Sequence, residues 1–588
     1  MAKEFGLKKA TDMTEVEKMR HSLAHIFAGV IMEMFPNTKL AIGPAVDNGF
    51  YYDVESDHIF TPEDFKTIEK AMYKVINKDL PFEGKEVSKA EAIKYFEGKN
   101  QPYKVEILNE LEDGDITFYS HGDFTDLCKG GHTESTGKVG AFKLDRVAGA
   151  YWRGDETNKM LQRIYGIAFE TKEKLKEFQT MREEAKKRDH RKLGKELDLF
   201  VFSDLVGSGL PLFTPRGTII REELENFVWE LMKPHGYQKV RIPHMAKIDL
   251  YKTSGHYEKF AEDIFHIKSK MTEDAFIMKP MNCPHHTQIY ASQQRSYRDL
   301  PIRYSEVTAV YRDENTGQLQ GLSRVRSITQ DDAHVFCTME QVKEEGKKIH
   351  DIVDKFYKPF GMPIKARLSR RDPDNHEKYL GKPEMWDKAE SMLKELIEEM
   401  EYDWVDGPGE ATFYGPKIDF IATDAIGRDW QLATIQLDFV QPERFQLKYT
   451  DRDGQEKTPV MIHRAILGSV ERFMAVMIEH YAGSFPVWLA PEQVRLLAVS
   501  DKHNDFVLEM QRSFEEAGIR VGVDTTSSTV GKKISIAEKM KIPYILVIGD
   551  KEAEGGNLTV RQRGKEEQYQ LSLDDFVNQV QKEMKDRT

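Results

Sequence analysis

The first amphipathic segment of the chain covers residues 15–34. Its apolar positions are Val16, Met19, Leu23, Ile26, Val30 and Ile31. This spacing of three and four residues predicts a helix, and Pro36 followed by Asn37 predicts its end. His21 and His25 are four residues apart within the segment, so we expect both side chains on one face of this helix.

The region between this helix and residue 170 mixes short elements of both kinds. Residues 49–53 have the aromatic and apolar character of a strand, residues 68–76 and 90–96 have helical spacing, and residues 128–140 are rich in glycine. This mixture predicts one α+β domain over residues 1–170.

Residues 172–193 are dense in Lys and Glu and carry only a thin apolar stripe. The stripe consists of Leu175, Phe178, Met181 and Ala185. A helix with so little apolar surface suits a linker between domains, which we place at residues 171–193. A solvated helix on the surface of one domain fits the same pattern equally well.

Beyond Gly194, long helices alternate with strands of period two. In residues 303–312, polar and apolar positions alternate, and strand character resumes at residues 325–328 after a loop that contains Asn315 and Gly321. This pattern predicts an antiparallel hairpin with a long loop.

The last hundred residues alternate strand-like and helical stretches. Strands are expected at 494–499, 520–523, 544–548 and 558–561, and helices at 505–517, at 532–540 and after Ser572. The alternation predicts a separate small α/β domain over residues 487–588.

The composition of the 588 residues is that of a globular protein, with 40% hydrophobic and 31% charged residues. The first nine residues lack the apolar run of a signal peptide, and no stretch approaches the ~18 apolar residues of a membrane span. The formal net charge of −13 means that nucleic acid would have to be bound by a local basic patch. Only three cysteines occur, which favours a reducing compartment, and we expect a cytoplasmic protein without a membrane partner.

Two pairs of possible metal ligands occur near the N-terminus. His21 and His25 form one pair, and Cys128 and His132 form the other, with Asp126 close by. Four such side chains could converge on zinc, whereas each pair alone is more often structural. The H-E-x-x-H pattern of zinc proteases does not fit, because Ser22 stands where that pattern has Glu.

A second set of candidates lies in the central region. Cys283, His334 and His463 are too far apart in sequence for a zinc finger, but three protein ligands would suit a catalytic zinc site with an open position. Residues 468–472 (Gly-Ser-Val-Glu-Arg) enter a helix, where backbone N–H groups and Arg472 could meet phosphate. No P-loop sequence occurs, and surface ion pairs remain the alternative for each arginine.

Three segments resemble the signature sequences of class II aminoacyl-tRNA synthetases. Residues 211–217 (Pro-Leu-Phe-Thr-Pro-Arg-Gly) with 240–243 (Val-Arg-Ile-Pro) resemble the first signature. Residues 304–312 with their hairpin resemble the second, and residues 468–472 resemble the third. The order of the segments is that of the family.

Further segments narrow the resemblance to the threonyl-tRNA synthetases. They are residues 281–286 (Met-Asn-Cys-Pro-His-His), residues 330–334 (Gln-Asp-Asp-Ala-His) and His463. The similarity covers nearly the whole chain. The N-terminal His and Cys pairs resemble the editing domain of that family.

The resemblance implies a multidomain fold and a ligase reaction. ATP and L-threonine would form threonyl-adenylate, and the threonyl group would pass to the terminal adenosine of tRNA(Thr). An editing domain (1–170) and a linker helix (171–193) would precede a class II antiparallel-sheet catalytic domain (194–486) and an anticodon-binding domain (487–588). The protein would be a homodimer with the segment around Pro243 at the interface.

The resemblance also assigns roles to single residues. Arg312 would hold the α-phosphate of ATP, Glu314 would meet the adenine amino group, and Arg324 and Arg472 would hold the outer phosphates with Mg²⁺. The zinc ligands would be Cys283, His334 and His463. The substrate-binding residues would be Met281, Gln330, Asp332, Tyr414, Lys417, Gln431, Thr434, Gln436 and Ser469, of which Asp332, Tyr414, Gln431 and Gln436 would line the threonine pocket.

Selectivity gives a reason for both a metal and an editing site. A hydrophobic pocket separates threonine from its isostere valine by only ~10²-fold, whereas zinc could bind the amino and hydroxyl groups that valine cannot both supply. Serine supplies both and lacks one methyl group, a difference of about 1 to 3 kcal/mol. Hydrolysis of seryl-tRNA(Thr) would therefore need a second pocket. The editing residues would be His21, His25, Asp126, Cys128 and His132, acting through side chains and water, although their spacing alone suggests zinc.

The chain departs from the family pattern in two ways. It starts almost directly at the editing domain, without the small β-rich module that commonly precedes it. Gly130-Gly131 stands before His132 where Gly-Pro is common. Anticodon contacts are expected from basic residues of the last domain, namely Lys532, Lys533, Arg561 and Arg563.

Two other classes of protein share part of these features. A free-standing editing hydrolase would not need the residues beyond Gly194. A synthetase-like regulatory protein should have lost Arg312, Arg472 or a zinc ligand, and this chain keeps them all. The enzyme is therefore the favoured interpretation.

Overall fold

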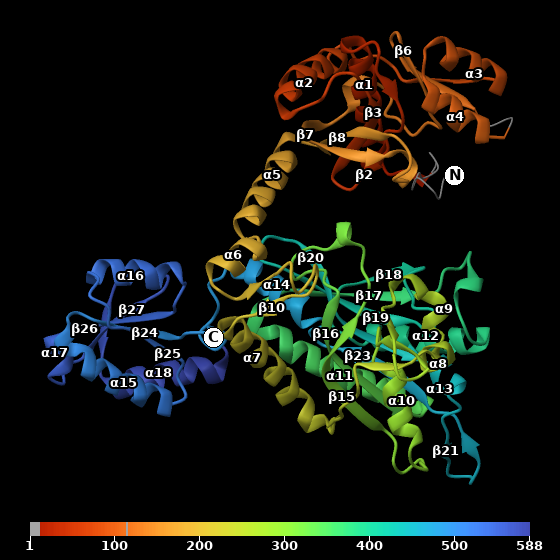
Figure 1. Ribbon diagram of the computed structural model, residues 1–588. Coiled ribbons are helices and arrows are strands. Elements are labelled where there is room, and N and C mark those ends of the chain that lie inside the picture. The colour runs from red at the N-terminus through yellow and green to blue at the C-terminus, as the bar shows by residue number, and fades with distance from the viewer. Residues whose placement is uncertain (1–11, 113–115) are drawn as a thin grey trace. The chain divides into compact units, whose positions relative to one another are not determined.

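The computed structural model describes residues 12–112 and 116–588. The chain forms two compact units, residues 1–183 and residues 184–588 (Figure 1). The first nine residues, expected to carry no signal peptide, lie outside the described part. Among the described helices, none combines the length and the apolar character that crossing a membrane requires.

The first unit is an α+β fold built around helix α1 (Glu15–Met34). The helix has the predicted bounds, and Thr14 and Glu17 close its N-terminus as a capping box. The helices that follow are α2 (Pro62–Ile76), α3 (Lys89–Gly98), α4 (Pro102–Glu110) and α5 (Lys172–Lys187). Helices α1 and α2 pack against the larger of two sheets and share one hydrophobic core with it.

Both sheets of the first unit are antiparallel. The larger has the order β1 (Lys39–Leu40), β3 (Gly49–Glu55), β8 (Met160–Phe169) and β7 (Ala141–Tyr151), with β2 (Ala45–Val46) also paired to β3. The smaller has the order β4 (Glu83–Glu86), β5 (Thr117–His121) and β6 (Phe124–Leu127). The glycine-rich segment after β6 is a loop that closes toward α1.

The expected unbroken helix over residues 172–193 is wrong. Helix α5 ends at Lys187, and a second helix, α6 (His190–Glu196), begins after Asp189. The Asp189 carboxylate accepts a hydrogen bond from the backbone N–H of Arg191 at 2.8 Å. This side chain therefore caps a new helix where charge patterning alone suggested continuation.

The second unit contains an eight-stranded sheet. Its strand order is β11 (Gln238–Lys239), β15 (Ile302–Tyr311), β16 (Ser327–Cys337), β23 (Val460–Ala465), β20 (Asp429–Asp438), β19 (Lys417–Thr423), β17 (Ile364–Arg370) and β18 (Trp404–Pro408). Neighbours are antiparallel except for the β11–β15 and β17–β18 pairs. The predicted hairpin is confirmed, because β15 and β16 pair over ten positions.

Helices cover this sheet and complete its core. Helices α7 (Pro215–Met232), α11 (Val342–Tyr357), α12 (Pro383–Glu398) and α14 (Val470–His480) contribute buried apolar side chains to the same core as the sheet. The remaining helices are α8 (Ile248–Ser254), α9 (His256–Lys259), α10 (Cys283–Ala291) and α13 (Val440–Arg444). Smaller pairings join β9 (Phe200–Val201) to β10 (Leu212–Phe213), β12 (Met245–Lys247) and β13 (His266–Lys268) to β14 (Ala275–Met278), and β21 (Tyr449–Thr450) to β22 (Glu456–Lys457).

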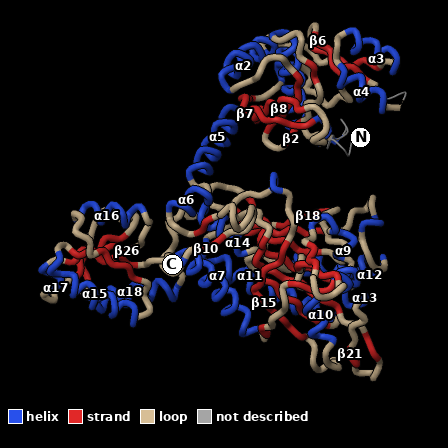
Figure 2. The backbone as a smooth tube through the Cα atoms, viewed as in Figure 1, coloured by secondary structure: helices blue, strands red, loops and turns tan. Residues whose placement is uncertain are grey.

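The C-terminal part is the predicted α/β fold with its own sheet (Figure 2). The order is β25 (Val521–Asp524), β24 (Val494–Ala498), β26 (Tyr544–Ile548), β27 (Leu558–Gln562) and β28 (Tyr569–Leu571). Its helices are α15 (Asn504–Glu516), α16 (Val530–Lys539), α17 (Asp550–Ala553) and α18 (Leu573–Asp586). Strand β28 and helix α17 were not expected, since three- and four-residue elements leave too little periodicity to detect.

Candidate active site

One face of the eight-stranded sheet is polar along its central strands. Residues directly opposite each other in antiparallel strands share a face, and the register places His334 opposite His463, His463 opposite Gln436, and Gln436 opposite Lys417. These four side chains therefore form a row across four strands. The residues that alternate with them, such as Ile462, belong to the hydrophobic core on the opposite face. One face of the central strands therefore carries polar side chains, and the other packs into the hydrophobic core.

Three potential metal ligands meet on this polar face. Cys283 lies at the first residue of α10, and one donor atom from each of Cys283, His334 and His463 lies within 4.8 Å of the others. The Nε2 of His334 is 3.0 Å from the Nδ1 of His463, whose Nε2 is 2.8 Å from Asp438 Oδ2. A carboxylate behind a ligating imidazole fixes its orientation in many zinc sites. One thiol and two imidazoles with such support fit zinc.

The electrostatics of the three groups also suit a cation. Burial, reinforced by His463, holds the pKa of His334 well below its ordinary value, so His334 is the neutral imidazole that metals bind. Burial raises the pKa of the Cys283 thiol far above its usual range. A bound cation would favour the thiolate here, as it does in zinc proteins.

Expected substrate residues surround this cluster. The Nδ2 of Asn282 donates to Asp332 Oδ2 at 3.0 Å, and Asp332 Oδ1 is 3.7 Å from His334 Nε2. The hydroxyl of Tyr414 donates to Gln436 Oε1 at 2.7 Å, and its ring stacks on His463 with centroids 5.0 Å apart. Asp332, Tyr414 and Gln436 are therefore brought close to the three donors.

Lys417, Gln431 and Thr434 gather instead around a carboxylate that the sequence did not point to. Asp419 is fully buried, with Lys417 Nζ 2.5 Å from its Oδ2. Its Oδ1 accepts from Gln431 Nε2 at 2.8 Å and from Thr434 Oγ1 at 3.3 Å. The Gln431 amide also accepts from Arg367. Gln431 is thus held by Asp419 and Arg367 rather than by the side chains near Cys283.

His256 is a neighbour of the cluster that the sequence did not reveal. Its Nε2 is 3.9 Å from Cys283 Sγ, and its Nδ1 lies 2.8 Å from Ser254 Oγ. The residue is fully buried, and burial lowers its pKa to about 3. No second ligand stands near it in sequence, so only Gly255, with its left-handed φ of 87°, marks the position as unusual.

The arginine candidates come from the hairpin and its loop. Arg312 follows β15, and its Nη2 is 3.3 Å from Met281 Sδ, two residues before Cys283 at the start of α10. Burial lowers the pKa of Arg312, but a guanidinium keeps its charge. Arg324 in the loop forms an ion pair with Glu314 at 2.7 Å. The structure therefore joins Arg324 and Glu314 to each other.

The third signature is held against β16. Gly468 has a φ of 78°, and a Cβ there would lie 2.7 Å from the carbonyl oxygen of Leu432, so this turn requires glycine. Ser469 caps α14 by accepting from the backbone N–H of Arg472 at 3.2 Å, and an isolated bridge joins it to Gln330. Arg472 consequently stands in the first turn of a helix whose N-terminus faces the edge of β16.

The first unit holds a second cluster. The Sγ of Cys128 is 3.0 Å from His21 Nε2 and 3.2 Å from His132 Nε2. His25 lies against His132, with ring centroids 4.9 Å apart, and its Nδ1 is 3.1 Å from the Nδ1 of His121. The two pairs of the sequence therefore converge, with His121 of β5 as a member that their spacing did not indicate.

The Asp126 carboxylate contacts a lysine and a tyrosine and no histidine among the described residues. Its Oδ1 is 2.8 Å from Lys104 Nζ, and its Oδ2 accepts from the Tyr52 hydroxyl at 2.6 Å. All three side chains are buried. Asp126 is thus held by Lys104 and Tyr52, which the sequence gave no reason to select because they lie on separate elements.

Burial keeps this second cluster uncharged. It lowers the pKa values of His21 and His121 to about 4 and raises that of Cys128 to about 12. Neutral imidazoles can accept a hydrogen bond from water and so orient it for hydrolysis. Donor atoms of His21, Cys128 and His132 also lie within 4.8 Å of one another, so the geometry alone permits a metal as well.

The loop that carries His132 explains one departure from the family pattern. Gly130 and Gly131 have φ values of 90° and 83°. Proline is fixed near −65° and could not adopt the conformation of Gly131. In this loop the backbone N–H of Gly130 donates to Cys128 Sγ at 3.3 Å.

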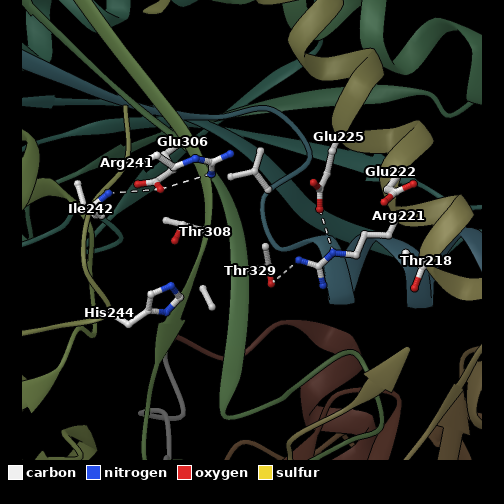
Figure 3. A pocket seen from close by; sticks show the side chains of 12 residues that line it. Thr218, Arg221, Glu222, Glu225, Arg241, Ile242, His244, Glu306, Thr308 and Thr329 are labelled. Carbon is white, nitrogen blue, oxygen red and sulfur yellow. Dashed lines mark hydrogen bonds and ion pairs between the residues drawn. The ribbon is translucent and has the colours of Figure 1, made fainter. Parts of the chain in front are cut away.

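A cavity of about 430 Å³ opens beside the first and second signatures (Figure 3). Strand β11 pairs with β15 only at Tyr304 and Ser305, and the cavity lies along the part of β15 beyond this pairing. Arg241 and Glu306 face each other in it, 3.5 Å apart. The side chain of Arg241 is 79% exposed, whereas Glu306 is buried and burial raises its pKa.

The basic candidates of the last domain differ in their environments. Lys532 is exposed, but Lys533 is buried and donates to the carbonyl oxygens of Ala498 and Asp524. The guanidinium of Arg563 donates to backbone carbonyl groups, including that of Ser484 at 3.1 Å. The expectation that Lys533 reaches RNA is therefore wrong, because this side chain is buried and donates within the fold. Arg563 is half-buried, and its contact with RNA stays a prediction.

Family models match three parts of the chain. Residues 116–165 match the threonyl and alanyl tRNA synthetase second additional domain, and residues 265–481 match the tRNA synthetase class II core domain (G, H, P, S and T). Residues 493–583 match an anticodon binding domain. The second range contains Cys283, His334 and His463, and the third covers the C-terminal sheet. The first range contains His121, Cys128 and His132 but not the histidines of α1.

Curated relatives match nearly the full length. A threonine–tRNA ligase of Cytophaga hutchinsonii is 48% identical over 96% of this chain and 88% of its own length. One from Synechocystis is 47% identical over 98% of this chain and 97% of its own. A solved structure from Cryptosporidium parvum, titled as the RNA binding domain of threonyl-tRNA synthetase, has a TM-score of 0.64 at 38% identity and covers 67% of this chain and 98% of that one.

Proposed function

This chain belongs to the threonyl-tRNA synthetase family, and from that premise we propose that it activates L-threonine with ATP and transfers it to tRNA(Thr). The observation that carries the proposal is the polar face of the eight-stranded sheet, where Cys283, His334 and His463 meet beside Arg312. A binding protein without catalysis would have no need to keep this set together.

Adenylate formation would rest on charge stabilisation and positioning. Arg312 lies beside Met281 at the cluster, where its guanidinium could hold the α-phosphate of ATP close to the threonine carboxylate. Arg472, in the first turn of α14, would act on the outer phosphates with Mg²⁺. Arg324 would join it by exchanging its pairing with Glu314 for a pairing with phosphate, and this would free Glu314 for the adenine amino group.

The zinc ligands would be Cys283, His334 and His463, with Asp438 orienting His463. The ion, when bound, would supply a Lewis acid for the amino and hydroxyl groups of threonine. Asp332, close to His334, could receive the substrate hydroxyl proton or its hydrogen bond. Tyr414, stacked on His463, would close the pocket over the threonine methyl group.

Hydrolysis of seryl-tRNA(Thr) would occur in the first unit. Serine offers zinc the same two groups as threonine, so the synthetic site can reject it by only about 10- to 200-fold. His21 and His132 contact Cys128 in the second cluster, and His25 packs against His132. These neutral imidazoles could position water against the ester. We propose that they act through side chains and water, as in the family.

The remaining assignments follow the same premise. We propose that the C-terminal domain binds the anticodon stem, which is supported by its match to an anticodon binding domain. The free state of the three cysteines supports a cytoplasmic location.

We further propose a homodimer in which residues 240–243 contact a second copy. The open edge of β15 and the exposed Arg241 beside the cavity support this (Figure 3). Sedimentation of the wild-type chain should give twice the chain mass at assay concentration, and Arg241→Glu should weaken the association by placing a carboxylate beside Glu306. A fully active monomer would contradict the proposal.

Threonine-dependent exchange of pyrophosphate into ATP tests the synthetic function. We expect exchange with threonine, weaker exchange with serine and almost none with valine. Arg312→Ala should lower the rate by about 10²- to 10³-fold, because it removes a preorganised cation from the phosphate. Arg298→Ala, at an exposed arginine that the structure places outside the sheet, is the matched control. Near-normal exchange in a folded Arg312→Ala protein would overturn the assignment.

A further inference from the structure

His190 is a buried histidine that the proposed reaction does not use. It is the first residue of α6 and is only 4% exposed. Its Nδ1 is 2.6 Å from Glu479 Oε1 near the end of α14, and its Nε2 is 3.0 Å from the backbone nitrogen of Leu322 in the hairpin loop. One imidazole therefore joins three segments that are far apart in sequence.

The two partners determine which nitrogen carries the proton. The backbone N–H of Leu322 can only donate, so Nε2 must accept. Glu479 is a carboxylate and accepts, so Nδ1 must carry the hydrogen. The ring is consequently the neutral Nδ1–H form, and both of its nitrogens are engaged. Although Asp189, His190 and Glu479 lie close enough together to suggest a metal, His190 could bind one only by giving up a hydrogen bond.

Both contacts reach elements that carry phosphate-binding candidates. Leu322 is buried and lies two residues before Arg324 in the loop between β15 and β16. Glu479 lies two turns along α14 from Arg472, and its Oε2 is 2.6 Å from Arg428. His190 thus joins the loop between β15 and β16, at Leu322, to helix α14, which carries Arg472.

The loop has the shape needed to receive this contact. Gly321 has a φ of 52°, and a Cβ on it would lie 2.3 Å from His190 Nε2. The backbone can approach the imidazole only because this position lacks a side chain. The loop is therefore held at residues 321–322. Gly321 allows the close approach, Leu322 is buried, and its amide donates to His190.

We infer that His190 is a positioning residue for ATP, which fixes the loop of Arg324 relative to Arg472 through its hydrogen bond to the Leu322 amide. The inference rests on the proposed function, because the loop matters only if ATP binds there. A simpler possibility is that His190 only stabilises the fold, in which case its loss should affect both substrates alike.

Two conservative variants separate these possibilities. The amide of His190→Asn can still donate to Glu479 but does not reach Leu322, whereas the longer side chain of His190→Gln can present its oxygen where Nε2 accepted. Both are compared with wild type by pyrophosphate exchange, with KM measured separately for ATP and threonine. His190→Asn should raise the KM for ATP about threefold to tenfold, as expected for one hydrogen bond.

The KM for threonine should stay within about twofold in both variants, and His190→Gln should restore the KM for ATP. Equal changes for both substrates, or an unchanged KM for ATP in His190→Asn, would overturn the inference.

Hydrogen exchange of the wild-type chain is a second measurement that needs no variant. A Leu322 amide that exchanges as fast as an amide without a hydrogen bond would also overturn the inference. If the wild-type chain showed no threonine-dependent exchange of pyrophosphate into ATP, that result would instead contradict the proposed function.

Discussion

At the scale of single residues, Cys283, His334 and His463 lead to the most specific prediction, which is that of a zinc site. Cys283 and Cys337 are both buried cysteines of the second unit, but only Cys283 lies with His334 and His463. We expect about one zinc per chain in the wild type and in Cys337→Ala, and loss of zinc in Cys283→Ala, since two imidazoles alone bind it weakly. Metal analysis of the purified variants measures this.

Cys128→Ala serves as a second control, because Cys128 also has two imidazoles within reach. Zinc that persists in Cys283→Ala and disappears in Cys128→Ala would place the metal in the first unit and contradict the assignment.

The sequence predicts the role of a single residue well only where the residue type and its place in a motif indicate the same chemistry. His334 lies in the segment 330–334 that carries the resemblance, and the resemblance assigns Gln436 to the threonine pocket. The strand register brings both residues to one face of the sheet. His256 and His121 carry no such pattern, since their partners come from distant segments. Lys533 shows the opposite error, because a basic residue on a helix is expected in solvent until the packing of that helix is known.

At the scale of elements, local periodicity was sufficient for helix α1 and for the β15–β16 hairpin. The order of the eight-stranded sheet was not predictable in this way, because β16 pairs with β23 across more than a hundred residues. The break between α5 and α6 was missed for a related reason. It depends on one capping side chain, Asp189, within a segment whose overall composition favours a helix.

Helix α16 offers a matched pair of lysines to test RNA binding. Lys532 is exposed, whereas Lys533 is buried and donates to Ala498 and Asp524 carbonyl groups. Lys532→Ala should raise the KM for tRNA about twofold to fivefold and reduce the salt dependence of binding by about one phosphate contact. Its stability should be unchanged.

Lys533→Ala should instead destabilise the C-terminal domain, because it removes the donor to the buried carbonyl group of Ala498 and to the half-buried carbonyl group of Asp524. Thermal unfolding and aminoacylation at several tRNA concentrations distinguish the two effects. An unchanged KM for tRNA in Lys532→Ala at low salt would show that α16 does not face RNA.

At the scale of the whole molecule, the two clusters lie in separate compact units. The synthetic cluster draws on α10 and the strands of the eight-stranded sheet, and the second cluster draws on α1, β5 and the loop after β6. Neither cluster takes a side chain from the other unit among the described residues. The two activities should therefore be separable by substitution.

Threonylation and hydrolysis of seryl-tRNA(Thr) should take place in different units. The most direct test of this separation uses the double substitution His21→Ala with His25→Ala in the full-length chain. His58→Ala is the matched control, because that histidine pairs with Asp64 in the same unit outside the cluster.

The measurement is deacylation of preformed seryl-tRNA(Thr), with the threonylation rate determined alongside. We predict that the double variant loses deacylation by at least about a hundredfold, the order expected for general acid–base groups, while its threonylation stays near wild type. Unchanged deacylation would contradict the account by returning both histidines to a structural role, and loss of both activities would contradict the independence of the two sites.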